Sequence, residues 1–320
     1  MNDTTYLLQL SDYQNRICKA KSFDWKLVAD SLRFLRQSKL RVPMLVARNG
    51  YRLVTNHFNN IRQHEVYDVV EQVILALLEC GLNDQAAELI EKVAIKFGKT
   101  SVRVRRLQAM LDESRSIYYN ANDTYLDILE KYPADMMSMK RQVSILKAKG
   151  MYVQAANLLN TFLQVYMGDF EAWLELASLH IRMLNYRNAA FCYEELILIQ
   201  PLHHSIYVKY AEIMYSIGGA DNYIIALKYY AHSLELNPSN LESENTTYPP
   251  TNLSAIYGII MSIFAFCNCH GGSTSKLRPV QLELYEWAQG ELKRITTKHS
   301  PLKLPLVSAF INATNVKQES

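Results

Sequence analysis

The stretch that decides the fold is WLELASLHIRMLNYRNAAFCYEELILIQP, which runs from Trp173 to Pro201. Its apolar residues form two stripes at the spacing of α-helices, and an alanine pair, Ala189-Ala190, lies near its centre. Pro201 closes it, because proline cannot continue a helix. Nothing in it is typical of a nucleophile, a metal cage or a phosphate-binding loop. The stretch therefore predicts two packed helices that serve structure rather than chemistry.

Small and large residues recur around this stretch with a period of 34 residues. The alanines at this interval are Ala87, Ala121, Ala155 and Ala189, followed after 37 residues by Ala226. The prolines that lie 12 residues after an alanine of this series are Pro133, Pro201 and Pro238. The tyrosines that lie four residues after one are Tyr125, Tyr193 and Tyr230. A fixed period of this length indicates a repeat architecture.

This pattern resembles the tetratricopeptide repeat, a unit of two antiparallel helices. Two helices can cross closely only where small side chains meet, which is the role expected of Ala177 and Ala189. Trp173 and Tyr193 are expected to fill the wider gaps. We predict an all-α, right-handed solenoid of helix pairs. Its predicted core residues are Ala87, Ala121, Ala155, Trp173, Ala177, Ala189, Tyr193, Pro201, Ala226, Tyr230 and Pro238.

The predicted domain organisation follows from this register. Helical caps are expected at 1–67 and 253–298, a polar loop at 241–252 and a flexible tail at 299–320, where Pro301 and Pro305 favour fraying. The N-terminal cap contains an amphipathic helix over Phe23–Gln37 and a second over Val42–Arg62, broken near Gly50. The five repeat units are 68–101, 102–135, 136–169, 170–203 and 204–240, the last with an insertion in its turn.

Composition limits the function classes. The net charge of +3 is too small to call for nucleic acid. The N-terminus lacks the features of a secretory signal. The longest apolar run, Tyr257–Cys269, has 13 residues, fewer than the ~20 that span a membrane. Five scattered cysteines suit a reducing compartment, so we expect a cytosolic chain.

Three clusters resemble chemical sites but lack the partners that chemistry needs. Cys267-Asn268-Cys269-His270 has metal-ligand spacing without a second cluster, whereas tetrahedral zinc takes four ligands. His203-His204 has no neighbouring carboxylate, and Glu194-Glu195 point apart on a helix. We therefore predict no catalytic, metal or cofactor-binding residue, and no enzyme.

A basic cluster, Arg103, Arg105 and Arg106 with Lys96 and Lys99, has two interpretations. It is either a solvated helix start or a positive patch that meets phosphates, lipid headgroups or an acidic partner segment. The near-neutral charge of the whole chain ranks an acidic protein segment above RNA.

In tetratricopeptide domains the first helix of each pair lines a concave partner-binding side. Here that register predicts a face that is basic in its N-terminal half and more apolar and mixed in its C-terminal half, suited to an extended partner. Its residues are Arg103, Arg106, Met110, Lys140, Ser144, Lys147, Glu171, Leu174, Ser178, Arg182, Val208, Glu212 and Tyr215. Domains that clamp chaperone tails carry asparagine at position nine of a repeat. That position holds Ala76, Met110, Ser144, Ser178 and Glu212 here, which argues against such a receptor.

The order of several motifs resembles the subunit 2 family of the endoplasmic reticulum membrane protein complex. The motifs are FDWKLVADSLRFLRQ at 23–37, RVRRLQAM at 103–110, KYPAD at 131–135, GDFEAWLELASLHI at 168–181 and YRNAAFCYEELILIQPLHH at 186–204. The insert Leu241–Asn252 and the first forty residues depart from the family pattern.

The resemblance implies a non-enzymatic scaffold, peripheral on the cytoplasmic side of the endoplasmic reticulum membrane. Its partners would be membrane-embedded and soluble subunits of a complex that inserts transmembrane helices of tail-anchored and multipass proteins. The alternative is a free tetratricopeptide adaptor or co-chaperone. An RNA-processing repeat protein ranks third, because the charge balance argues against it.

Overall fold

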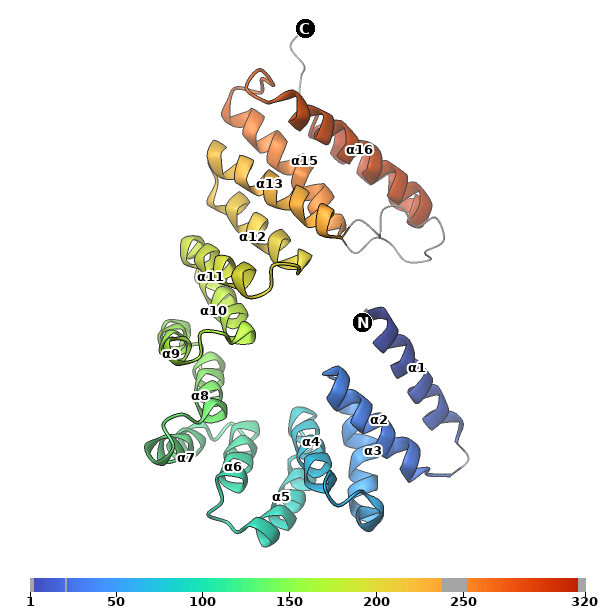
Figure 1. Ribbon diagram of the computed structural model, residues 1–320, viewed down its shortest axis with the longest axis vertical. Coiled ribbons are helices and arrows are strands. Elements are labelled where there is room, and N and C mark those ends of the chain that lie inside the picture. Colours follow the sequence, from blue (N-terminus) through green and yellow to red (C-terminus); the bar gives the residue numbers. More distant parts are fainter. Residues whose placement is uncertain (1–2, 21, 238–251, 316–320) are drawn as a thin grey trace. The chain divides into compact units, whose positions relative to one another are not determined.

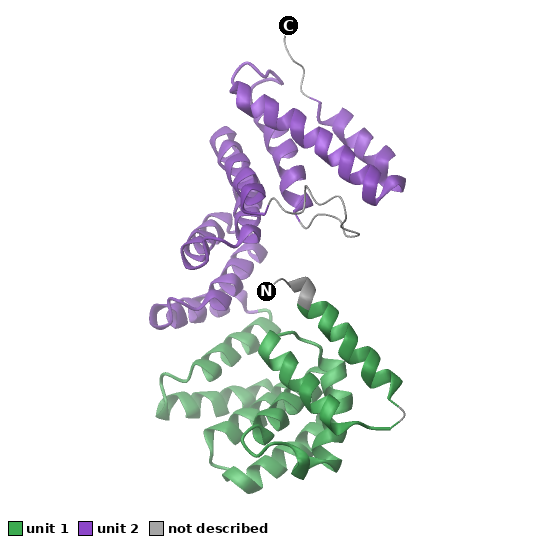
Figure 2. Ribbon diagram, turned by 45° about the vertical axis from the view of Figure 1, so that its right-hand side comes forward, with its two compact units in different colours: residues 1–150 green, residues 151–320 purple. Residues whose placement is uncertain are grey.

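The computed structural model of the chain describes residues 3–20, 22–237 and 252–315. Within these ranges every regular element is a helix and there is no β-strand, which confirms the all-α prediction (Figure 1). The chain divides into two compact units, residues 1–150 and 151–320 (Figure 2).

The first unit opens with three helices that precede the repeats. These are α1 (Asp3–Lys19), α2 (Trp25–Ser38) and α3 (Pro43–Asn56), with a short 3₁₀ turn at Phe58–Asn60. The repeat helices of this unit are α4 (Val66–Glu79), α5 (Asn83–Phe97), α6 (Val102–Ser114), α7 (Tyr118–Lys131) and α8 (Met136–Ala148). One apolar core runs through α2 to α6 and contains Leu32, Leu53, Val73, Leu89 and Leu107. The N-terminal helices thus extend the repeat core instead of forming a separate one.

Helix α3 corrects one prediction, since it continues through Gly50 without a break. Gly50 is buried, and a Cβ atom placed there would lie 2.4 Å from Cγ2 of Val73 on α4. The glycine therefore permits close contact between two helices and does not interrupt one.

The second unit contains α9 (Tyr152–Val165), α10 (Phe170–Arg182), α11 (Tyr186–Ile199), α12 (His204–Ile217) and α13 (Ala220–Leu236). It continues with α15 (Leu253–Cys269), α16 (Pro279–His299), a 3₁₀ turn at Pro301–Lys303 and α17 (Leu304–Ala313). Each predicted repeat contains two helices. We call α4, α6, α8, α10 and α12 the first helices and α5, α7, α9, α11 and α13 the second helices.

The stretch from Trp173 to Pro201 covers most of α10 and all of α11, which pack against each other. Ala177 and Ala189 are fully buried and Tyr193 is buried, whereas Trp173 is only half-buried. The Trp173 indole N–H donates to the carbonyl oxygen of Met167 at 2.8 Å. Pro201 is exposed in the turn that follows α11. Small residues therefore pack inside the pair, and the proline acts only as a helix stop.

Two aspartates begin first helices in the same way. The side chain of Asp135 accepts from the Ser138 N–H at the start of α8, and that of Asp169 accepts from the Ala172 N–H at the start of α10, both at 3.0 Å. Such caps satisfy backbone donors that have no partner within the helix.

The core alanine of the first repeat is Ala86 and not the predicted Ala87. Ala86 is fully buried, and Ala87 is half-buried against the rim of the core. Helix α5 begins 35 residues before α7, whereas α7, α9 and α11 begin 34 residues apart. Counting back in steps of 34 therefore moves the register by one residue at this repeat. The buried alanines Ala121 and Ala155 lie where the 34-residue period places them, and the buried Ala226 follows Ala189 at the longer interval of 37 residues.

The segment after His299 was expected to fray but contains α17. Val307 and Ile311 of this helix are buried, and the Tyr285 hydroxyl of α16 donates to the carbonyl oxygen of Thr314. Pro305 lies in the first turn, where proline is tolerated because that backbone N–H has no partner within the helix. The predicted core residue Pro238 and the predicted polar loop up to residue 251 lie outside the described residues.

Candidate partner-binding surfaces

The arginines at the start of α6 are engaged within the chain. Arg103 lies 2.6 Å from the Glu71 carboxylate on α4 and also donates to the carbonyl oxygen of Tyr67 at 3.2 Å. Arg106 pairs with Asp135, the cap of α8, at 3.2 Å. The third arginine of the cluster, Arg105, pairs with Asp127 of α7 at 3.0 Å.

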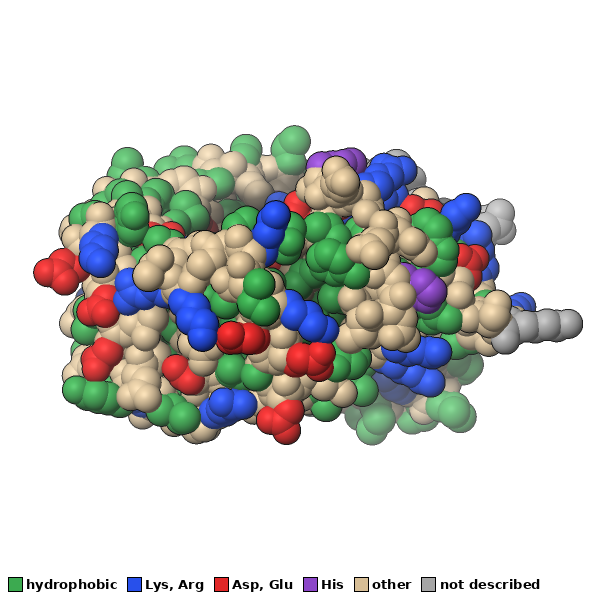
Figure 3. Space-filling view, turned by 90° about the horizontal axis from the view of Figure 1, so that it is seen from below, with side chains coloured by type: hydrophobic (Ala, Val, Ile, Leu, Met, Phe, Trp, Pro, Cys, Tyr) green, Lys and Arg blue, Asp and Glu red, His purple; other side chains and the backbone are tan. Residues whose placement is uncertain are grey.

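These ion pairs contradict both interpretations of the three arginines in the basic cluster. The three guanidinium groups link α6 to its neighbours, so they form neither a solvated helix start nor an open patch for an acidic partner. Arg103 and Arg106 are also only half-buried, which makes each pair a modest contribution to stability. On the face that Figure 3 shows, Lys and Arg side chains are interspersed with Asp and Glu and with hydrophobic side chains. The expectation of a free basic surface in the N-terminal half is therefore corrected.

The remaining predicted surface residues of the first unit are half-buried. Met110 packs against the small core around Ala121 and Tyr125. On α8, the Ser144 hydroxyl donates to the carbonyl oxygen of Lys140 at 3.2 Å, and Lys147 is half-buried. The predicted surface residues of α6 and α8 are therefore only partly exposed.

Helix α10 presents the most accessible part of the predicted face in the second unit. Glu171, Ser178 and Arg182 are exposed, and Leu174 is half-buried. The guanidinium of Arg182 lies 4.5 Å from the centre of the Tyr152 ring of α9. Helix α10 thus exposes both charged and uncharged side chains, and its role as a partner-binding face stays a prediction.

Helix α12 departs from the prediction because it is covered on several sides. Val208, expected on the surface, is 6% exposed, since α12 contacts α11, α13 and α15. Glu212 pairs with Lys209 at 2.7 Å, and the half-buried Tyr215 ring lies 5.3 Å from that of Tyr223. Of the three predicted α12 residues, Val208 belongs to the core and the other two to intramolecular clusters.

A buried polar cluster in the first unit was not predicted. The Tyr125 hydroxyl of α7 donates to Glu113 Oε1 of α6 at 2.6 Å, and Arg141 Nε of α8 donates to the same oxygen at 3.0 Å. A second bond from Arg141 reaches the other carboxylate oxygen, so the ion pair is bidentate. The Glu113 side chain is 9% exposed. One carboxylate thereby ties three successive helices together.

The cysteines do not form a reactive or metal-binding site among the described residues. Cys267 is buried in α15 and Cys269 is exposed at its end. Burial raises the pKa of the Cys192 thiol to about 12, which keeps it protonated and unreactive. Over the described ranges, no group of three or more His, Cys, Asp or Glu side chains could hold a metal ion.

The second helices carry exposed apolar side chains that sequence reasoning missed. Ile95 on α5 and Leu198 on α11 are 80% and 76% exposed. Others of the same kind are Tyr119, Leu126, Val153, Val165 and Phe191. Single exposed apolar residues are common, but their recurrence on four of the five second helices, α5, α7, α9 and α11, is typical of surfaces that bind partners.

Comparison with known proteins identifies relatives over nearly the whole chain. The EMC2 TPR-like repeat domain matches residues 96–228. ER membrane protein complex subunit 2 of Dictyostelium discoideum is 46% identical over 97% of this chain and 95% of its own length. The protein of the same name from Xenopus tropicalis is 31% identical over 84% of this chain and 86% of its own.

A solved structure supports the fold. The C-terminal part of a TPR repeat-containing protein from Cytophaga hutchinsonii superposes with a TM-score of 0.54, at 13% identity, over 84% of this chain and 97% of that one. This likeness shows a tetratricopeptide-like solenoid. None of the helices in the described ranges is both long enough and apolar enough to cross a membrane.

Proposed function

The chain belongs to the family of ER membrane protein complex subunit 2, and from that membership we propose that it is a scaffold subunit of this complex. The observation that carries the proposal is the alignment with the Dictyostelium relative, which leaves almost no part of either chain unmatched. A shared repeat alone would show only the fold. An end-to-end match at 46% identity also includes the helices before and after the repeats.

In this proposal the chain is not an enzyme and lies on the cytoplasmic side of the endoplasmic reticulum membrane. It holds cytosolic segments of the membrane-embedded subunits and thereby supports the insertion of transmembrane helices. Helix pairs stacked in a solenoid provide long surfaces for extended partners. The exposed side chains of α10 and the exposed apolar residues of the second helices support such contacts.

Affinity purification of the tagged full chain from detergent-solubilised membranes tests the proposal. We expect a stoichiometric set of membrane subunits to be recovered. A chain that recovers only chaperones would instead be a free adaptor, and the scaffold proposal would be rejected. Because partners stabilise the folded chain by mass action, its abundance should also fall in cells that lack the membrane subunits.

A further inference from the structure

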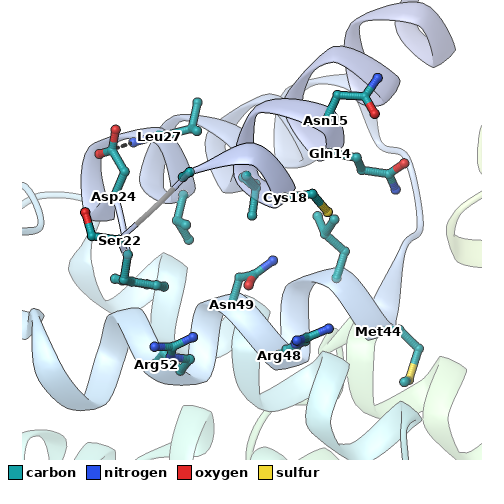
Figure 4. Close-up of a pocket in the computed structure, with 15 residues that line it drawn as sticks. Gln14, Asn15, Cys18, Ser22, Asp24, Leu27, Met44, Arg48, Asn49 and Arg52 are labelled. Carbon is teal, nitrogen blue, oxygen red and sulfur yellow. Dashed lines mark hydrogen bonds between the residues drawn. The ribbon is translucent and has the colours of Figure 1, made fainter.

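The first unit contains an open cavity between α1, the start of α2 and α3 that none of the predicted surfaces includes (Figure 4). Its volume is 860 Å³, within the range of pockets that bury ligands. Phe23, Leu27, Val28 and Leu45 give it an apolar lining. Of these only Val28 is buried, so the apolar surface remains accessible to a partner.

The charged side chains of the cavity come mainly from one face of α3. Arg48 and Arg52 are one helical turn apart and both are exposed (Figure 4). Arg52 lies over the Phe23 ring, with its guanidinium carbon 4.9 Å from the ring centre. Across the ranges that the structure describes, neither arginine forms an ion pair, in contrast to the three arginines of α6.

The single carboxylate of the lining is already engaged. Asp24 Oδ1 accepts from the N–H groups of Lys26 and Leu27 at 3.0 and 3.2 Å, which caps α2. The N-terminus of a helix carries partial positive charge, so it offsets this carboxylate. The cavity therefore presents two guanidinium groups without a carboxylate partner among the described residues, beside an apolar floor.

We propose that this cavity binds an amphipathic helix of a partner protein that carries two acidic residues one turn apart beside apolar ones. The two acidic residues of the partner helix can pair with Arg48 and Arg52, which gives charge complementarity. The apolar residues beside them can then cover the apolar floor of the cavity. The cavity lies between helices, and the described part of the chain offers no strand edge on which a peptide could add a strand. Laying a helix into the groove is the recognition mode that this architecture provides.

The inference rests on the proposed function, since the partner is expected among the subunits that the full chain recovers. The test uses that complex, with the photo-crosslinker p-benzoylphenylalanine in place of Met44. Met44 lines the cavity and is 71% exposed, so the replacement leaves the core intact. The same crosslinker in place of Leu302, which is 96% exposed in the 3₁₀ turn after α16 and lies outside the proposed surfaces, is the control for unspecific contacts.

We expect the Met44 position, and not the Leu302 position, to crosslink a subunit segment with acidic residues at one-turn spacing. The double reversal Arg48→Glu with Arg52→Glu should lower the yield about tenfold or more. The control Lys96→Glu with Arg187→Glu makes the same change in net charge at exposed positions outside the cavity and should leave the yield unchanged. Reversing the two partner acids to lysine should restore the crosslink to the arginine-reversed chain.

Three results would overturn the inference while the complex still assembles. They are a crosslinked segment without acidic residues, a yield that the reversal does not change, and no crosslink at all. Flotation with vesicles of phosphatidylcholine and phosphatidylserine tests whether the cavity binds lipid headgroups instead of a protein segment. Binding to these vesicles that depends on Arg48 and Arg52 would show a membrane-binding site instead. If no subunit is recovered, the proposed function fails and the inference fails with it.

Discussion

Replacing Glu113 with alanine should destabilise the region from α6 to α8 by about 2–5 kcal/mol. The substitution leaves the fully buried Tyr125 hydroxyl without its acceptor, which costs about 1–3 kcal/mol. It also leaves the Arg141 guanidinium without its carboxylate. Breaking a buried pair costs about 3–5 kcal/mol. The Arg141 side chain is 31% exposed and regains water, so we take about 1–2 kcal/mol for this part.

The partners of Glu113 separate these contributions. Tyr125→Phe removes the hydroxyl, so it should recover part of the loss when it is combined with Glu113→Ala. Arg141→Met removes the charge while it keeps most of the apolar stem, and should recover the other part. Residues in one hydrogen-bonded network couple by about 0.5–3 kcal/mol, and a double-mutant cycle measures that coupling directly.

Hydrogen exchange of the full chain is the suitable assay, because repeat proteins open locally and not in one step. Backbone amides of α6, α7 and α8 should exchange faster in the Glu113→Ala variant, while those of α15 and α16 should keep their rates. Glu88→Ala is the matched control. Glu88 also accepts from a tyrosine, Tyr51, and pairs with Lys92, but on the surface, so its loss should leave the exchange rates of α5 nearly unchanged. Equal exchange in the two variants would refute the role given to the cluster.

Three further outcomes are expected. Ala189→Glu places a charge without a partner at the α10–α11 crossing and should lower the melting temperature through a loss of several kcal/mol; an unchanged melting temperature would refute the register. Gly258→Ala puts a Cβ atom 2.4 Å from the Tyr230 ring and should cost about 1–3 kcal/mol in urea unfolding, whereas Gly290→Ala meets open space and should be neutral or stabilising. Burial lowers the pKa of His180, so the unfolded state takes up its proton first and stability should fall as pH drops through about 6.5. His180→Phe should flatten that pH dependence of the melting temperature.

The sequence predicted the helix pairs because their spacing is set by steric rules that act on single residues. A small residue at each helix crossing, and a proline after three of the five pairs, recur at a fixed spacing, so the period is visible without a structure. The same reasoning failed where the spacing between repeats changes, as at Ala86. It also failed where a residue type that often ends a helix has another structural role. Gly50 and Pro305 are common at breaks, but one permits a close helix contact and the other begins a helix.

The candidate surface was harder to predict because it depends on which charges find partners inside the chain. Arg103 and Arg106 look free in the sequence, yet their carboxylates lie 32 and 29 residues away on neighbouring first helices or their caps. These separations are close to one repeat. Opposite charges about one repeat apart would therefore have been a usable signal of the pairing. Val208 shows a second limit, since its burial depends on α12 being packed among α11, α13 and α15, which the repeat register alone does not predict.

Reversing the charge of an arginine that is paired within the chain should lower stability, whereas reversing an arginine without such a pair should lower only partner binding. Arg106→Glu would place a carboxylate against Asp135, which caps α8, so both the ion pair and the helix start are affected. That variant should lose protection in α6 and α8 whether or not a partner is present. Arg48 and Arg52 have no such intramolecular carboxylate among the described residues, so their reversal should change partner binding and leave exchange rates of α2 and α3 in the isolated chain unaltered. If Arg48→Glu with Arg52→Glu speeds hydrogen exchange in the isolated chain, these arginines stabilise the fold. The proposal that the cavity between α1 and α3 binds a partner would then be rejected.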